Sequence, residues 1–169
     1  MSKTRPFKQT SSLVSIGAIL TTTAPDTYSQ LEVQLPLSSL DREIFVVTDV
    51  EFTLEAPAAI AATDTDTSVQ VTSSSQTGML AVNSPALIGK KQLMIRQGVV
   101  GLEEGNPGDS YSTGAQADYI AIIATPNYYL AVDGNNNTVN QTGAVRVRGF
   151  RAVAEAAAYA ALVTEELNQ

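Results

Sequence analysis

The chain of 169 residues contains no cysteine, no histidine and no tryptophan. Without cysteine it has no thiol nucleophile and no disulfide, and without histidine it cannot build a Ser-His-Asp triad or a common zinc or haem site. Most catalytic chemistry is thereby excluded, so we expect a protein that is not an enzyme and that carries no cofactor. The lack of cysteine leaves the redox compartment open, because such a chain suits the cytosol and the exterior equally.

Charge is also scarce, since 16% of the residues are charged and 44% are hydrophobic. The net charge of −7 is unevenly distributed: Lys3, Arg5 and Lys8 give the first twelve residues +3 and leave −10 on the rest. An acidic body is a poor general surface for nucleic acid. We therefore expect contact with nucleic acid to be weak or indirect and to involve this basic segment. A surface with few charges is often one that a partner covers.

Long apolar runs are missing too, because no stretch approaches the ~20 residues that a membrane-spanning helix needs. A chain of this length is one domain by the usual prior and can bury roughly two-thirds of its unfolded surface. We divide it into a basic N-terminal arm (1–12), a β-sandwich (13–151) and a C-terminal helix (152–169). A signal peptide at the start is the alternative, although Pro6 and Phe7 are unusual in such a segment.

The strongest pattern is the stretch LDREIFVVTDVEFTLEAPA at residues 40–58, whose middle alternates as one long strand should. We expect Ile44, Val46, Val50, Phe52 and Leu54 on the core face. The opposite face then carries the other members of the alternation, which are Phe45, Val47, Asp49, Glu51 and Thr53.

Other short apolar stretches lie between clusters of Ser, Thr, Asp, Asn and Gly, which is typical of strands joined by surface loops. With the central strand they are nine in number: 13–21, 29–37, 44–54, 68–72, 78–82, 92–96, 118–125, 127–132 and 144–150. Residues 56–62 favour a helical turn because they are rich in alanine. The segment 99–117 is expected to be a long loop, and 133–143 a turn of residues that tolerate positive φ.

The last segment is the only convincing helix. At 100° per residue, one stripe collects mostly small apolar side chains, whereas Glu155, Glu165 and Glu166 lie off it. The stripe consists of Ala152, Ala156, Tyr159, Ala160, Val163 and Leu167. Because the strands should direct their apolar sides into the sandwich, we expect the helix to lie on an outer face, that of a neighbouring subunit rather than its own. Tyr159, Val163 and Leu167 are thus candidate assembly residues.

Several acidic groups are candidates for chemical sites. Asp64, Asp66 and Asp133 offer oxygen ligands for calcium, and one alternative is a calcium ion held between two chains at a subunit interface. None of these aspartates has the spacing of a complete calcium-binding loop. Glu103 with Glu104, or Asp41 with Glu43, would be the carboxylate pairs of a glycosidase, yet neighbouring acids in loops are usually surface charge. Asn136 and Asn140 begin N-x-T sequons, which are most simply turn residues.

Arg146 and Arg148 alternate with valines, so both guanidinium groups leave the sheet on the face opposite Val145 and Val147. They pair with acidic neighbours or face packaged nucleic acid. We favour ion pairing, because the arm and this strand together are weakly basic.

The chain resembles a small single jelly-roll capsid protein of a virus. The resemblance rests on the basic arm SKTRPFK, the strand EIFVVTDVEFTLEAP, the late segments YYLAVDG and GAVRVRGFRA, and strands without His or Cys joined by Ser/Thr-rich loops. It implies an all-β fold, an antiparallel β-sandwich of jelly-roll type with a short N-terminal arm and one C-terminal α-helix. It also implies a coat protein whose many copies, with other virion proteins as further partners, close into a symmetric shell around a genome, in the virion.

Two other classes fit the composition. One is a filament, pilus or surface-layer subunit at the extracellular surface, which low charge and abundant Thr, Ser and Ala favour. The other is a carbohydrate-binding or adhesive β-sandwich, which Tyr111, Tyr119, Tyr128 and Tyr129 favour.

Overall fold

The computed structural model describes residues 7–97, 102–105 and 119–168, with no side chains described at 97 and 102–105. These residues form ten strands and one helix: β1 Phe7–Gln9, β2 Val14–Thr21, β3 Ser29–Gln34, β4 Glu43–Leu54, β5 Thr65–Thr72, β6 Leu87–Gln97, β7 Leu102–Gly105, β8 Ala121–Ile123, β9 Asn127–Asn135, β10 Thr142–Ala154 and α1 Ala156–Leu167.

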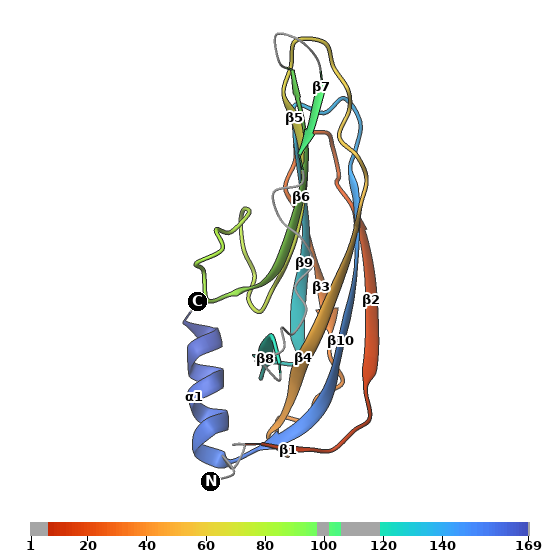
Figure 1. The fold of residues 1–169 in the computed structure, drawn as a ribbon. Coiled ribbons are helices and arrows are strands. Elements are labelled where there is room, and N and C mark those ends of the chain that lie inside the picture. The colour runs from red at the N-terminus through yellow and green to blue at the C-terminus, as the bar shows by residue number, and fades with distance from the viewer. Residues whose placement is uncertain (1–6, 98–101, 106–118, 169) are drawn as a thin grey trace.

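The strands form two antiparallel sheets that face each other (Figure 1). In the first sheet, β2 and β1 both pair with the same side of β10, one after the other along its length. β4 pairs with the other side of β10, and β8 pairs with β4. The second sheet has the order β3-β9-β5-β6-β7. Apart from β1 and β7, the eight remaining strands are distributed as two Greek keys over two four-stranded sheets, which is the jelly roll. The predicted fold class is therefore confirmed.

The main core lies between the two sheets. Its fully buried members include Val50 and Val147 of the first sheet and Val69, Tyr128 and Leu130 of the second. These side chains come from alternate positions of their strands, as the two facing surfaces of a sandwich require.

A β-bulge divides β4 into two parts. Its register with β10 shifts between Arg148 and Gly149, which pair with Asp49 and Val47, so that Thr48 is left out of the ladder. Because the extra residue reverses the alternation, Phe45 and Val47 join Val50 and Phe52 in the main core.

The expected faces of β4 were thus wrong for its first half. Ile44 and Val46 were placed in the sandwich but belong to a second cluster on the outer side. Gly149 makes the bulge possible, since a Cβ there would lie 2.8 Å from Phe45 Cε1 and would overlap the carbonyl oxygen of Val46.

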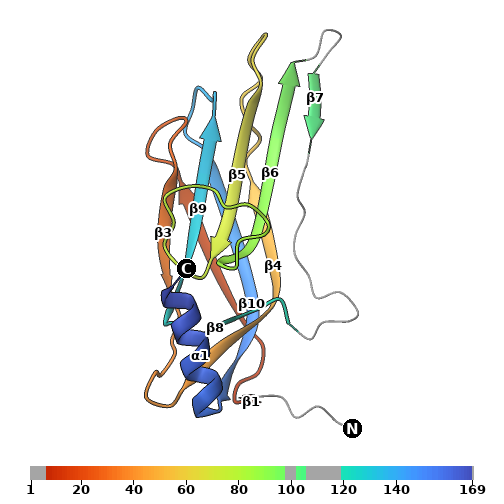
Figure 2. The ribbon, with the colours of Figure 1, turned by 90° about the vertical axis from the view of Figure 1, so that its left-hand side faces the viewer.

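The helix packs on this second cluster, which also includes Ala124, Ala152 and Ala154. Figure 2 shows α1 lying beside β8 at one end of the sandwich. The helix begins at Ala156 rather than at residue 152, because β10 continues to Ala154 and pairs there with Phe7. The predicted helix is confirmed, with a later start.

Three local expectations were wrong. Residues 78–82 form no strand; instead the side chain of Gln70 binds this segment by donating to the carbonyl of Gly78 at 3.0 Å and accepting from the N–H of Leu80 at 2.7 Å. Residues 56–62 form no helical turn. Within the expected loop 99–117, residues 102–105 form the strand β7. The strands expected on either side of Pro126 are present as β8 and β9, and they lie in different sheets. Most of the expected loop 99–117 lies outside the described residues.

Candidate assembly surface

The outer face of the first sheet has two halves. One half lies under α1, and the other presents alternate residues of β4, β10 and β2. Arg146 lies 3.5 Å from a carboxylate oxygen of Glu51, and Arg148 pairs with Glu51 at 2.9 Å and with Asp49. The expected ion pairing is confirmed, and it leaves two arginines and two acids on a locally neutral surface. A contact of Arg146 or Arg148 with nucleic acid stays a prediction.

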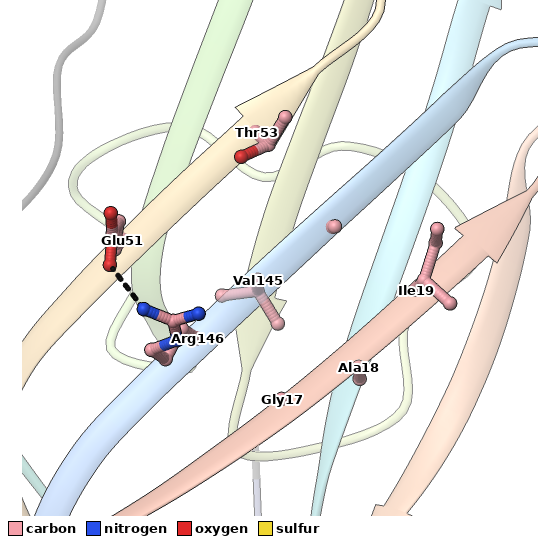
Figure 3. A pocket seen from close by; sticks show the side chains of 8 residues that line it. Gly17, Ala18, Ile19, Glu51, Thr53, Val145 and Arg146 are labelled. Atoms are coloured by element: carbon pink, nitrogen blue, oxygen red, sulfur yellow. Dashed lines mark ion pairs between the residues drawn. The ribbon is translucent and has the colours of Figure 1, made fainter.

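A shallow hollow of about 330 Å³ lies beside these ion pairs (Figure 3). Gly17 and Ala144, which have no long side chains, line this hollow together with Ile19 and the Arg146–Glu51 ion pair. Figure 3 shows that Ile19, Arg146 and Glu51 come from three neighbouring strands, β2, β10 and β4. Thr53, Ala18 and Val145 complete the lining. Since Ile19 is 67% exposed, this hollow combines apolar surface with a fixed charge pair.

The strand beside the hollow, β2, is unusually poor in charge. No charged residue occurs between Lys8 and Asp26. Two large apolar side chains are nevertheless exposed there, Ile19 and, at 62%, Leu13. A chain of net charge −7 thus presents one long uncharged strand at the border of a sheet.

The basic segment is partly integrated into the fold. Phe7–Gln9 pairs with β10, and the Phe7 ring contacts Tyr119 and Phe150 with centroids 5.9 and 6.4 Å apart. Lys8 is exposed on this strand. Lys3 and Arg5 lie outside the described residues. From Phe7 onwards, the segment 1–12 is therefore joined to the first sheet by β1 and is not a separate arm.

The helix contacts its own subunit. Tyr159, Leu162 and Val163 pack on the second cluster, so the preference for a neighbouring subunit was wrong for Tyr159 and Val163. Leu167 is 74% exposed, so of the three candidate assembly residues it is the one still available to contact a neighbouring subunit. The side of the helix that packs on the sheet differs from the predicted stripe, because Ala156 and Ala160 of that stripe are exposed.

Sequence reasoning missed Glu166, which is 7% exposed. Its carboxylate accepts hydrogen bonds from the backbone N–H groups of Ala124 at 2.7 Å and Thr125 at 2.9 Å. Burial raises the pKa of Glu166, and the hydrogen bonds from Ala124 and Thr125 offset part of that effect. The sequence spacing could have predicted this position, because Glu166 follows Tyr159 by two helical turns and therefore lies on the same face of the helix.

Acidic groups gather at one end of β5 and β9. Burial raises the pKa of Asp133, and the negative charges of Asp66 and Asp26 add to the effect. Asp66 accepts from Asn135 at 3.1 Å and Asp26 from the N–H of Asn137 at 2.7 Å. No group of three or more His, Cys, Asp or Glu residues able to hold a metal occurs among the described residues. Calcium at a subunit interface stays a prediction.

The other candidates serve local structure. Asp41 and Glu43 accept hydrogen bonds from the hydroxyl and the N–H of Ser38, at 2.8 and 2.9 Å, and so hold one turn. Asn136 adopts φ 56°, the left-handed conformation expected of a turn. The side chains of Glu103 and Glu104, on β7, lie outside the described part.

The tyrosines do not form one platform. Tyr128 is fully buried, and burial raises its pKa to about 12. Tyr129 is half-buried, and Tyr119 contacts Phe7. Tyr111 lies outside the described residues. Within the described ranges, no helix is long and apolar enough to cross a membrane.

Comparison with known proteins identifies no family for this chain. No family model matches it, and no curated protein matches it. Among solved structures, a chain of Desmodium yellow mottle tymovirus is similar, with 11% identity, a TM-score of 0.31, and coverage of 86% of this chain and 90% of that chain. A TM-score this low carries no argument, so the fold assignment depends on the strand pairing described above.

Proposed function

We propose that this chain is a structural coat protein whose copies assemble into a symmetric viral shell around a genome. The observation that carries the proposal is the strand order, β2-β10-β4-β8 facing β3-β9-β5-β6. This double-sheet jelly roll occurs in viral capsid subunits and also in lectins and cupins. Because one fold can host several functions, features outside the strand order must select among these classes.

The surface favours assembly over ligand binding. Large apolar side chains are exposed on several sides of the subunit, with Leu40 at 95%, Val82 at 79%, Leu167 at 74% and Ile19 at 67%. Apolar side chains that are exposed singly are common on monomeric proteins, so of these four we give weight to Ile19, which lies on an uncharged strand and lines the hollow. Chemistry of the cupin type is disfavoured, because the chain has no histidine to ligate a metal.

The adhesive alternative loses its main support. It depended on a tyrosine surface, but Tyr128 lies in the core, and Tyr119 and Tyr129 belong to different parts of the fold. The filament alternative differs from the shell only in how copies are arranged, and the morphology of the assembly distinguishes them.

The contact with the genome would be modest. Arg146 and Arg148 are neutralised by Asp49 and Glu51, which leaves Lys3, Arg5 and Lys8 as the cations of the proposed nucleic-acid contact. These three charges can neutralise few phosphates, so the affinity should be low and should fall only modestly with salt.

Electron microscopy and mass photometry of the purified full chain test the proposal. Closed particles of uniform mass are the expected result. Fibres would favour the filament alternative over the closed shell. A monomer at every protein and salt concentration would overturn assembly altogether.

A charge variant tests the genome contact. Particles with Lys3→Ala, Arg5→Ala and Lys8→Ala should retain less nuclease-protected nucleic acid than wild type. The matched control, Lys90→Ala, Lys91→Ala and Arg96→Ala, removes the same number of charges from β6. Equal loss in both variants would refute a specific role of the N-terminal segment.

A further inference from the structure

One border of the first sheet is open along β2, which pairs only with β10 among the described residues. The N–H of Thr22 donates to the carbonyl of Gln141 at 2.9 Å. Hydrogen-bonded and non-hydrogen-bonded pairs alternate in an antiparallel ladder, so the even-numbered residues of β2 exchange bonds with β10. The backbone N–H and C=O groups of Ser15, Gly17, Ile19 and Thr21 therefore point away from the sheet.

The free borders of β3 and β4 are less suitable for pairing. The same reasoning from the bond between the N–H of Leu35 and the carbonyl of Pro126 leaves Gln30, Glu32 and Gln34 on the free side of β3. A second copy paired there would bring Glu32 close to its own counterpart, and a charge of this kind protects an edge strand. β4 has a free border beyond residues 45–47, where its pairing with β8 ends. Val50 and Phe52 are only 0% and 7% exposed there, so this border is covered.

We propose that β2 pairs antiparallel with β2 of a second copy of this chain, around a two-fold axis that passes beside Ala18. This register places Ser15 opposite Thr21 and Gly17 opposite Ile19, and it uses all four residues whose backbone groups point outward. The two first sheets then become one continuous sheet across the contact. The interaction is isologous, as in most symmetric dimers.

The side chains complement each other in this register. Ser15, Gly17, Ile19 and Thr21 share the outer face, and Ile19 of each copy lies opposite Gly17 of the other. Gly17 has no side chain, and it lines the hollow of about 330 Å³ (Figure 3). Ile19 of the second copy can therefore lean over Gly17 towards the hollow and lose much of its 67% exposure.

Charge favours the same partner. Two copies, each of net charge −7, repel one another, and a contact free of like charges adds least to that repulsion. The strand from Val14 to Thr21 carries none. The inference rests on the proposed function, to which it adds the two-fold contact between subunits.

An introduced cysteine tests the register, because the chain has no other thiol. Ala18→Cys should give a disulfide-linked dimer under mild oxidation, since residues facing each other across a non-hydrogen-bonded pair lie about 4.5 Å apart at Cα, within disulfide range. The matched control is Leu31→Cys, at the equivalent position on the free border of β3. A cross-link through Leu31→Cys and none through Ala18→Cys would overturn the inference.

A second variant tests the energetics without cysteine. Ile19→Lys puts two cations at the contact and should raise the Kd of the dimer at least tenfold, about 1.4 kcal/mol. Circular dichroism should stay unchanged because the side chain is exposed. The control is Leu40→Lys, the same change at a residue that is 95% exposed. Equal assembly of Ile19→Lys and wild type would refute the β2 contact.

The outcomes separate the two proposals. Shells that form without the Ala18→Cys cross-link overturn the β2 contact and leave the coat function standing. Cross-linked dimers that never form particles overturn the coat function and leave the β2 contact standing. Monomers in every condition overturn both.

Discussion

The carboxylate of Glu166, in the last turn of α1, accepts a hydrogen bond from the backbone N–H of Ala124 at the end of β8. The donor group is buried and its acceptor comes from a residue 42 positions away. A buried N–H without an acceptor costs about 1–3 kcal/mol. The contact therefore binds the helix to the sheet at one end, while Tyr159 and Val163 pack on the second cluster.

Replacing Glu166 tests this attachment. Glu166→Ala should lower the free energy of unfolding by about 2 kcal/mol or more, because it leaves two backbone N–H groups without acceptors. Urea denaturation followed by circular dichroism measures the loss. Glu165→Ala, one residue away and exposed, should change stability by less than about 0.5 kcal/mol. Equal effects of the two variants would contradict the role given to Glu166.

The raised pKa of Glu166 also predicts a pH dependence. Between the pKa of the unfolded chain and that of the folded chain, the native state holds a proton that the unfolded state has lost. The stabilisation is fully present below the unfolded pKa and is lost as pH rises through the folded pKa. Unfolding titrations from about pH 4 upwards should show this decline in wild type and a smaller one in Glu166→Gln. The decline that persists belongs to groups such as Asp133, whose pKa is also raised.

Tyr128 carries a hydroxyl with no hydrogen-bond partner among the described residues, in a fully buried position. Tyr128→Phe should be neutral or stabilise the protein by up to about 1 kcal/mol, because it removes an unsatisfied polar group without changing the ring. Tyr28→Phe is the matched control, since that hydroxyl donates to Gln30 at 3.1 Å and its removal should destabilise. A loss of stability in Tyr128→Phe would show that the hydroxyl has a partner.

Gly149 should tolerate no side chain. Gly149→Ala forces a Cβ against the backbone of Val46 and the ring of Phe45, and overpacking against backbone should cost about 3 kcal/mol or more. Gly78→Ala adds the same methyl group where nothing lies within 4 Å and should leave the midpoint of urea unfolding unchanged. If both variants unfold at the wild-type midpoint, the bulge does not require glycine.

Aspartate on the inner face of α1 distinguishes a helix that belongs to the subunit from one that serves only assembly. Tyr159→Asp with Val163→Asp should detach the helix from Ile44 and Val46, because each change buries an unpaired charge. Limited proteolysis near Glu155 should accelerate, and the free energy of unfolding should fall. The control is Ala160→Asp on the exposed side of the same helix. A double variant with wild-type stability but impaired assembly would show instead that Tyr159 and Val163 contact a neighbouring subunit.

Much of the architecture follows from local pattern. The alternation in residues 14–21, 29–34 and 43–54 identifies strands wherever one face is buried and the other is wet. The spacing of Arg146 and Arg148 predicts that both leave the sheet on one side, where acids of β4 meet them. The asparagine-rich turn follows from residues that tolerate positive φ, as Asn136 shows. These properties depend on near neighbours in the chain, so the sequence determines them by itself.

The tertiary structure decided the rest. The bulge at Thr48 depends on pairing with β10, about a hundred residues away, and it moves Ile44 and Val46 to the outer face. That apolar cluster on the outer side explains why α1 packs on its own subunit, and the N–H groups of Ala124 and Thr125, which donate to its carboxylate, explain why Glu166 turns inward. The open border of β2 likewise exists only once β10 has paired with β2 on one side and with β4 on the other. A single strand reveals its period but not its partner, because register is set by contacts between segments that are distant in sequence.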